Sequence, residues 1–143
     1  MPNSLFRVSA RNHAGMILMT QIAALGTGPV KSLPGGDYVS LKEVSERMGL
    51  SQGFLEEIAT LLKKAGLIKA RKGPGGGYRL SRPANKITAE QILVALEGPI
   101  NLVECHGGAC PVAELCSSKA LWNFLQQDIL ESLKKTTLDK MLN

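Results

Sequence analysis

Three cysteines lie close together in the C-terminal third of the 143-residue chain, and they are its most reactive side chains. Four residues separate Cys105 from Cys110 and five separate Cys110 from Cys116, a spacing found neither in zinc-binding CxxC pairs nor in the common ferredoxin runs. Gly107 and Gly108 lie between the first two, and glycine lets a backbone approach a bound group closely. Three thiolates in such a loop could hold an iron–sulfur cluster and leave one iron open to another ligand. Three reduced thiols or a zinc ion would fit the same residues, and an odd number of cysteines argues against a structural disulfide framework.

A second group of chemically active side chains is basic. Residues 63–86 contain eight lysines and arginines and no acidic residue, in a chain whose net charge is only +5. A block of one sign favours binding to a polyanion, because contacts to phosphates release condensed counterions. The alternative is a solvated surface whose counter-charges lie elsewhere in the fold.

The basic block overlaps the end of a predicted pair of helices. Ser40 is the expected N-cap of the first helix, and Ser51 is the expected N-cap of a second helix that ends at Gly66. Gly49 supplies the tight turn between them. A helix-turn-helix needs apolar residues at its inward positions, because these hold the two helices at one crossing angle. The inward positions here are all apolar: Val44, Met48, Leu50, Leu55 and Ile58.

Two short runs, LIKAR and GYRLSR, flank a glycine-rich turn and predict a β-hairpin. A basic hairpin that directly follows the second helix of a helix-turn-helix is interpreted as a wing. Glu56, near the start of the second helix, could accept a hydrogen bond from a cytosine amino group. Lys72 could reach the DNA backbone or the minor groove. The GPGGG turn lacks the GKS or GKT sequence and the following helix of a nucleotide-binding loop. The predicted DNA-binding residues are Ser51, Gln52, Gly53, Phe54, Glu56, Arg71, Lys72, Gly75, Gly76 and Tyr78.

The remaining periodic segments predict three more helices. These are residues 8–25, the run ITAEQILVALEG with Thr88 as its N-cap and Gln91 at the capping-box position, and roughly residues 117–134. The last carries an apolar stripe of Trp122, Leu125, Ile129 and Leu133, which we expect to pair with a second copy of the chain. The fold class is therefore predicted as mainly α with a small β-hairpin wing. Residues 1–86 would form a winged helix-turn-helix domain, and residues 87–143 the cysteine loop and dimerisation helices. No apolar run reaches the roughly 20 residues that span a bilayer, so we expect a cytoplasmic protein without membrane contact.

The helix pair, the GPGGGY turn, the cysteine triplet and the ALW start of the last helix together resemble the IscR, NsrR and CymR group of bacterial transcription regulators. The resemblance extends over essentially the whole chain. It implies a homodimer held by crossing C-terminal helices, which binds a palindromic operator in double-stranded DNA. It also implies that Glu56 reads a base, that Lys72 is the wing cation, and that the cysteines hold a two-iron or four-iron cluster.

The resemblance leaves the fourth cluster ligand open. Lys119 stands where IscR has a ligating histidine, and a protonated lysine cannot bind iron. NsrR instead uses an acidic residue from the first helix of the other subunit, and aligning the QIAAL segment places His13 at that position. His106, next to Cys105, is a further candidate.

These features predict a homodimeric DNA-binding transcription regulator, expected to be a repressor, that senses redox state, nitric oxide or iron–sulfur status through its cluster. The alternative is a cluster-free regulator of the same fold, controlled by thiol oxidation or by a partner protein. An electron carrier would leave the wing and the basic block unexplained. An enzyme is disfavoured, because neither histidine lies in a recognisable catalytic triad and no paired carboxylates flank a glycine loop.

Overall fold

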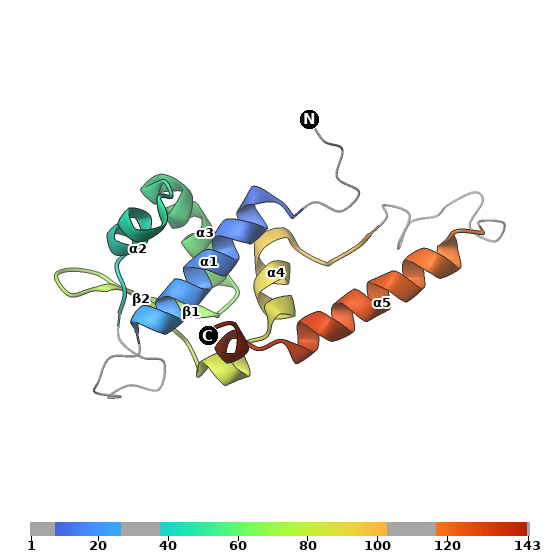
Figure 1. Ribbon diagram of the computed structural model, residues 1–143. Helices are drawn as coiled ribbons and strands as arrows, with labels where there is room; N and C mark the ends of the chain where they lie inside the picture. The colour runs from blue at the N-terminus through green and yellow to red at the C-terminus, as the bar shows by residue number, and fades with distance from the viewer. Residues whose placement is uncertain (1–7, 27–37, 103–116, 143) are drawn as a thin grey trace.

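The computed structural model describes residues 8–26, 38–102 and 117–142 and shows helices with one β-hairpin (Figure 1). This confirms the predicted fold class, a winged helix-turn-helix followed by a long C-terminal helix. In chain order the elements are α1 (Ala10–Leu25), α2 (Leu41–Met48), α3 (Gln52–Lys64), β1 (Ile68–Arg71), β2 (Gly77–Leu80), η1 (Ala84–Lys86), α4 (Ala89–Glu97), α5 (Lys119–Lys135) and η2 (Leu138–Met141).

Side-chain caps fix where the helices begin. Ser40, Ser51 and Thr88 each accept a hydrogen bond, through the side-chain oxygen, from the backbone N–H three residues further on. The Gln91 side chain in turn accepts from the Thr88 N–H, which completes a capping box at the start of α4. Gly49 ends α2 with a φ of 68°, a left-handed conformation that glycine adopts without a steric penalty. These four helix boundaries were predicted from the sequence and are confirmed.

One hydrophobic core joins α1, α2, α3, the hairpin and α4. The core continues past residue 86, because Ile87, Ile92 and Leu96 belong to it, as does Leu138 near the C-terminus. The predicted boundary between two domains at this residue stays a prediction. The fully buried large side chains are Leu18, Met19, Ile22, Val44, Leu55, Ile58, Leu62, Leu67, Ile87, Ile92 and Leu138.

One predicted inward position of the helix pair is wrong. Val44, Leu55 and Ile58 are buried as expected, whereas 39% of Met48 is exposed. Met48 is the last residue of α2, and the chain turns away at the following glycine, so α3 does not cover it. Instead the Ser45 hydroxyl, one turn back, donates a hydrogen bond to the Leu50 carbonyl and so links α2 to the start of α3.

The C-terminal segment returns to the helical head after α5. The Ala89 N–H donates to the Thr136 carbonyl and the Leu138 N–H donates to the Ile87 carbonyl, each over 2.8 Å. Leu138 thereby becomes a core residue. Figure 1 shows α5 running away from the head, with its C-terminal end attached there. None of the seventeen residues of α5 is buried, although the helix is rich in large apolar side chains.

No helix in the described ranges combines the length and the apolar character that crossing a membrane requires.

Candidate nucleic-acid interface

The start of α3 presents polar groups to solvent. Ser51 caps the helix, and Gln52, Gly53 and Glu56 follow it as exposed residues. The first turn of α3 contains no acidic residue, so its free backbone N–H groups and the positive end of the helix dipole are not neutralised by its own side chains. This end of α3 can therefore accept an anionic partner.

Phe54 differs from its neighbours. Its side chain is half-buried and packs against the hydrophobic core, so part of the ring helps to hold α3 in the head. Its predicted contact with DNA stays a prediction.

The hairpin projects beside the helix pair and carries its positive charge on exposed residues. Arg71 ends β1, and Lys72 follows it as an exposed side chain at the start of the turn. Gly75 has a φ of 74°, so the tip needs glycine for its conformation. A Cβ at Gly76 would lie 2.2 Å from the Arg71 carbonyl oxygen, so this glycine is needed for space. Tyr78 is half-buried, which leaves the two basic residues as the accessible groups of this part of the hairpin.

A third short segment extends the hairpin. Tyr78 and Val39 exchange two backbone hydrogen bonds of 2.7 and 2.8 Å, so the chain entering α2 lies along β2. Tyr38, just before this bridge, was missed by the sequence analysis. Its ring lies 5.7 Å from the Arg71 guanidinium carbon and 5.3 Å from that of Arg79. The signal available was the alternation of basic residues along the two strands, which places them on one face of the hairpin.

Within the described parts of the chain, the basic side chains of the hairpin take part in no ion pair. The two pairs found there join Lys134 to Glu90 over 3.8 Å and Lys135 to Glu131 over 2.9 Å. Both lysines belong to α5, and the hydrogen bond from Lys135 lowers the pKa of the Glu131 carboxyl. No described carboxylate pairs with a basic residue of the hairpin, so this surface keeps its positive charge.

The predicted metal ligands are only partly within the described residues. Cys105, His106, Cys110 and Cys116 lie outside them. His13 is exposed in the first turn of α1. Among the residues that are described, no three His, Cys, Asp or Glu side chains come together to form a metal site.

The chain on either side of the cysteine segment is attached to α5. The Leu102 N–H donates to Gln126 Oε1 over 3.2 Å, and Gln126 Nε2 donates to Asn101 Oδ1 over 3.5 Å. At the other end, Ser117 leads within two residues into Lys119, the first residue of α5. Both described flanks of the cysteine segment therefore depend on the same helix.

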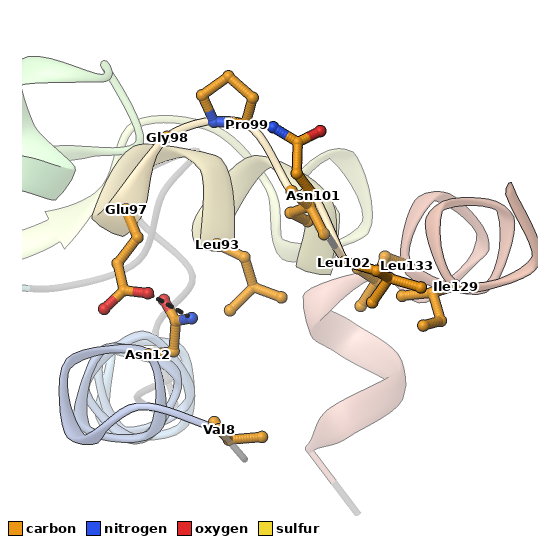
Figure 2. A pocket seen from close by; sticks show the side chains of 11 residues that line it. Val8, Asn12, Leu93, Glu97, Gly98, Pro99, Asn101, Leu102, Ile129 and Leu133 are labelled. Carbon is orange, nitrogen blue, oxygen red and sulfur yellow. Dashed lines mark hydrogen bonds between the residues drawn. The ribbon is translucent and has the colours of Figure 1, made fainter. Parts of the chain in front are cut away.

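A groove of about 600 Å³ separates α5 from the head (Figure 2). Asn12 and Glu97 form its polar end, where Asn12 Nδ2 donates to Glu97 Oε2 over 3.2 Å. His13 directly follows Asn12 in the first turn of α1. Leu93 of α4 and Ile129 and Leu133 of α5 contribute apolar side chains, and Val8 and residues 98–102 complete the wall.

Comparison with known proteins identifies the family to which this head and helix belong. Residues 12–143 match the Rrf2 family, which is described as iron-dependent transcriptional regulators. The chain is a member of the Rrf2 family. This confirms the resemblance inferred from the sequence, and the family and its relatives are transcriptional regulators and not enzymes.

Relatives and solved structures agree with membership of the Rrf2 family. The HTH-type transcriptional regulator IscR of Photobacterium profundum is 37% identical over 105 residues, which cover 73% of this chain and 61% of that protein. The match therefore spans about three fifths of the relative's length. The structure of CymR, the global cysteine regulator of B. subtilis, superposes with a TM-score of 0.77 at 29% identity and covers 96% of both chains. T. potens IscR gives a TM-score of 0.69 at 31% identity, over 96% of this chain and 86% of that one.

Proposed function

We propose that this Rrf2-family protein is a homodimeric repressor that binds a palindromic operator and senses redox state, nitric oxide or iron–sulfur status through a cluster at Cys105, Cys110 and Cys116. The observation that carries the DNA-binding part is the exposed start of α3 beside a hairpin whose positive charges have no described carboxylate partner. The cytoplasm is the proposed compartment, because operator DNA and reduced thiols are both found there.

The two DNA-binding elements have different tasks. Glu56 on α3 is exposed and can accept from a cytosine amino group in the major groove, so it reads sequence. Lys72 at the wing contacts the sugar–phosphate backbone or the minor groove and contributes affinity with little sequence dependence. The other residues proposed to contact or shape the interface are Ser51, Gln52, Gly53, Phe54, Arg71, Gly75, Gly76 and Tyr78.

A second copy of the chain is proposed to cover α5. Leu121 is 52% exposed and Phe124 is 65% exposed, and Ile129 lies on the wall of the open groove. Large apolar side chains gathered on one exposed helix mark an interaction surface. If the α5 helices of two copies cross about a twofold axis, each copy buries the same residues, and the two α3 helices face half-sites of a palindrome.

The donor set of the chain fits an iron–sulfur cluster. Three cysteines within twelve residues supply soft thiolate ligands, and the family description as iron-dependent regulators supports iron over zinc. His13 of the partner subunit is proposed as the fourth ligand, because His13 is exposed and directly follows Asn12, which lines the groove. When bound, the cluster would supply a centre that reacts with oxygen or nitric oxide.

Contacts within the protein could transmit a structural change in the cysteine segment to the DNA-binding head. The flanks of the cysteine segment depend on α5 through Gln126 and Lys119, and α5 is joined to the head by the hydrogen bond between Thr136 and Ala89. A rearrangement of this segment would thus move α5 and, in a dimer, change the distance between the two recognition helices. Small changes in that distance alter affinity, because half-sites lie about one helical turn apart.

A cluster-free regulator is the second candidate. The structural likeness to CymR, with a TM-score of 0.77, is somewhat greater than that to T. potens IscR, with 0.69. In this reading the three thiols would respond by oxidation or through a partner protein.

Anaerobic purification separates the two candidates. We expect coloured protein with an iron-to-sulfide ratio near one, and a visible spectrum that is lost in Cys110→Ser and kept in the control Ser117→Ala. Colourless, iron-free protein from a strictly anaerobic preparation would reject the cluster and favour thiol oxidation. Retention of DNA binding by that protein would leave the regulator assignment intact.

A further inference from the structure

One face of the hairpin gathers basic side chains. Residues directly opposite in an antiparallel pair point to the same side, and alternate residues along a strand share a face. The register pairs Lys69 with Arg79 and Arg71 with Gly77, so all three basic side chains project from one face. Like charges that lie directly opposite each other destabilise a pair of strands, so this arrangement is unfavourable for the free protein.

Tyr38 brings the two arginines together on that face. Its ring centroid is 5.7 Å from the guanidinium carbon of Arg71 and 5.3 Å from that of Arg79. Both distances are within the range of a cation–π contact. The two guanidinium groups are therefore no farther apart than these distances together, which is about one Debye length at 0.1 M salt.

The backbone holds Tyr38 in this position. Val39, the next residue, exchanges two hydrogen bonds with Tyr78 on β2. A Cβ at Gly77 would lie 2.3 Å from the Val39 carbonyl oxygen, so only glycine permits this close approach. The backbone next to Tyr38 is thus placed by the hairpin itself and does not depend on the side chains that the ring contacts.

The arginines have hydrogen-bonding capacity that the described residues do not use. Arg79 is half-buried, and its Nε is buried without a hydrogen-bond partner in the described parts of the chain. No described carboxylate forms an ion pair with Arg71 or Arg79. Asp37, which precedes Tyr38 in sequence, lies outside the described residues. A guanidinium stacked on a ring still offers its N–H groups at the edge, in a geometry that suits phosphate oxygens.

We propose that Arg71 and Arg79, held against Tyr38, form a binding site for a phosphodiester of the DNA backbone on the face of the hairpin. Tyr38 is a positioning residue, and Arg79 is a phosphate ligand distinct from the wing cation Lys72. This inference rests on the DNA-binding part of the proposed function and is independent of the cluster and of the dimer.

Salt-dependent binding to a mixed-sequence duplex about 30 base pairs long tests the site, because a backbone contact does not depend on sequence. Arg79→Gln should reduce the slope of log affinity against log salt by about one unit, since one phosphate contact is lost. Between about 50 and 200 mM salt, the variant should therefore lose about threefold less affinity than the parent. Lys140→Gln removes one exposed charge near the C-terminus, outside the basic block of residues 63–86, and should keep the parent's slope.

Two variants of Tyr38 separate positioning from folding. Tyr38→Phe keeps the ring face and should bind as the parent does, whereas Tyr38→Leu should weaken binding several-fold while the Val39 hydrogen bonds keep the hairpin folded. The effects of Tyr38→Leu and Arg79→Gln should be less than additive, because both disrupt the same contact. Additive effects, or equal binding by Tyr38→Phe and Tyr38→Leu, would show that the ring does not position the arginines.

Two further measurements identify the anion. The NMR signal of the Arg79 Nε–H should shift when duplex is added and should not shift with inorganic phosphate at the same phosphate concentration. An equal shift with inorganic phosphate would mean that the site binds free phosphate and not the DNA backbone. If Asp37→Asn strengthens duplex binding while Arg79→Gln changes nothing, the arginines serve an internal ion pair and the proposal is overturned. A parent protein that binds no duplex would reject this site together with the proposed function, whereas a parent-like Arg79→Gln would reject the site alone.

Discussion

Glu56 and Lys72 are both exposed, but they carry opposite charges on different elements. A carboxylate is repelled by phosphates and is useful only where it accepts from a base, so Glu56→Ala should relax sequence preference. The expected loss against the preferred operator is about 1–3 kcal/mol, with affinity for unrelated duplexes unchanged or higher. Binding selection from a randomised duplex library, with the parent and the variant side by side, measures this preference.

Lys72→Ala should have the complementary effect. Loss of a backbone cation should weaken binding to every duplex by a similar factor and lower the salt slope by about one unit, with the selected sequence unchanged. Lys140→Ala, which removes an exposed lysine near the C-terminus, is the control. A changed operator preference in Lys72→Ala would assign a base contact to the wing.

Single residues show which positions local sequence can predict. Ser40, Ser51 and Thr88 were predicted as caps, because capping is decided by groups three residues apart. Met48 was predicted as buried from its spacing, but burial also depends on where the neighbouring helix ends. Tyr38 was missed because the two arginines that it contacts lie in a hairpin more than thirty residues further along the chain.

Helix packing around α1 depends on one small residue. A Cβ at Gly15 would lie 2.3 Å from Leu96 Cδ1, and Leu96 is itself buried in the core and cannot move freely. Gly15→Ala should therefore lower the free energy of unfolding by about 1–3 kcal/mol, despite the better helix propensity of alanine. Gly53→Ala is the matched control, because a Cβ there would meet its nearest atom only at 3.8 Å. The control should be neutral or stabilise by up to about 1 kcal/mol, and denaturant unfolding compares the two variants.

The attachment of the cysteine segment to α5 is also testable. Gln126→Ala removes the acceptor of the Leu102 N–H, so we expect faster hydrogen exchange at that amide. Gln127→Ala, at the exposed neighbouring position, should leave the exchange rate unchanged. Equal exchange in both variants would mean that the start of the cysteine segment is held by other groups.

The observed helix boundaries lie close to the predicted ones where capping residues and apolar periodicity indicate the same position. The last long helix was predicted over roughly 117–134 and is observed at Lys119–Lys135. The short η2 and its return to the head were not predicted. They depend on backbone hydrogen bonds from Leu138 to Ile87 and from Ala89 to Thr136, and residues about fifty positions apart leave no local pattern. The DNA-binding and metal-binding residues were selected by chemistry and by resemblance, and their roles stay predictions.

The described part of the molecule combines a well-packed head with an arm, α5, that the other described residues leave uncovered. The core of the head uses residues from α1 to η2, whereas α5 has no buried residue and borders an open groove (Figures 1 and 2). A folded monomer with this shape leaves apolar surface in water, which is the usual condition of a subunit whose folding is completed by association. The groove and the apolar stripe of α5 lie on the same chain, so in a twofold dimer each copy could cover the apolar surface of the other.

The proposed association through α5 can be tested at Ile129. It is 36% exposed in the single chain, so a carboxylate placed there could still reach water and need not unfold the head. In a dimer formed through α5 the same carboxylate would be buried in an apolar interface without a partner, at a cost that prevents association. Ile129→Glu should therefore sediment as a folded monomer, with the helical circular dichroism of the parent, and should bind a palindromic duplex far more weakly, since only one half-site is engaged at a time. Gln127→Glu places the same charge at an exposed position of the same helix and should remain dimeric. If Ile129→Glu sediments as a stable dimer, the copies associate through another surface, and the arrangement of two α3 helices on one operator must be derived from that surface instead.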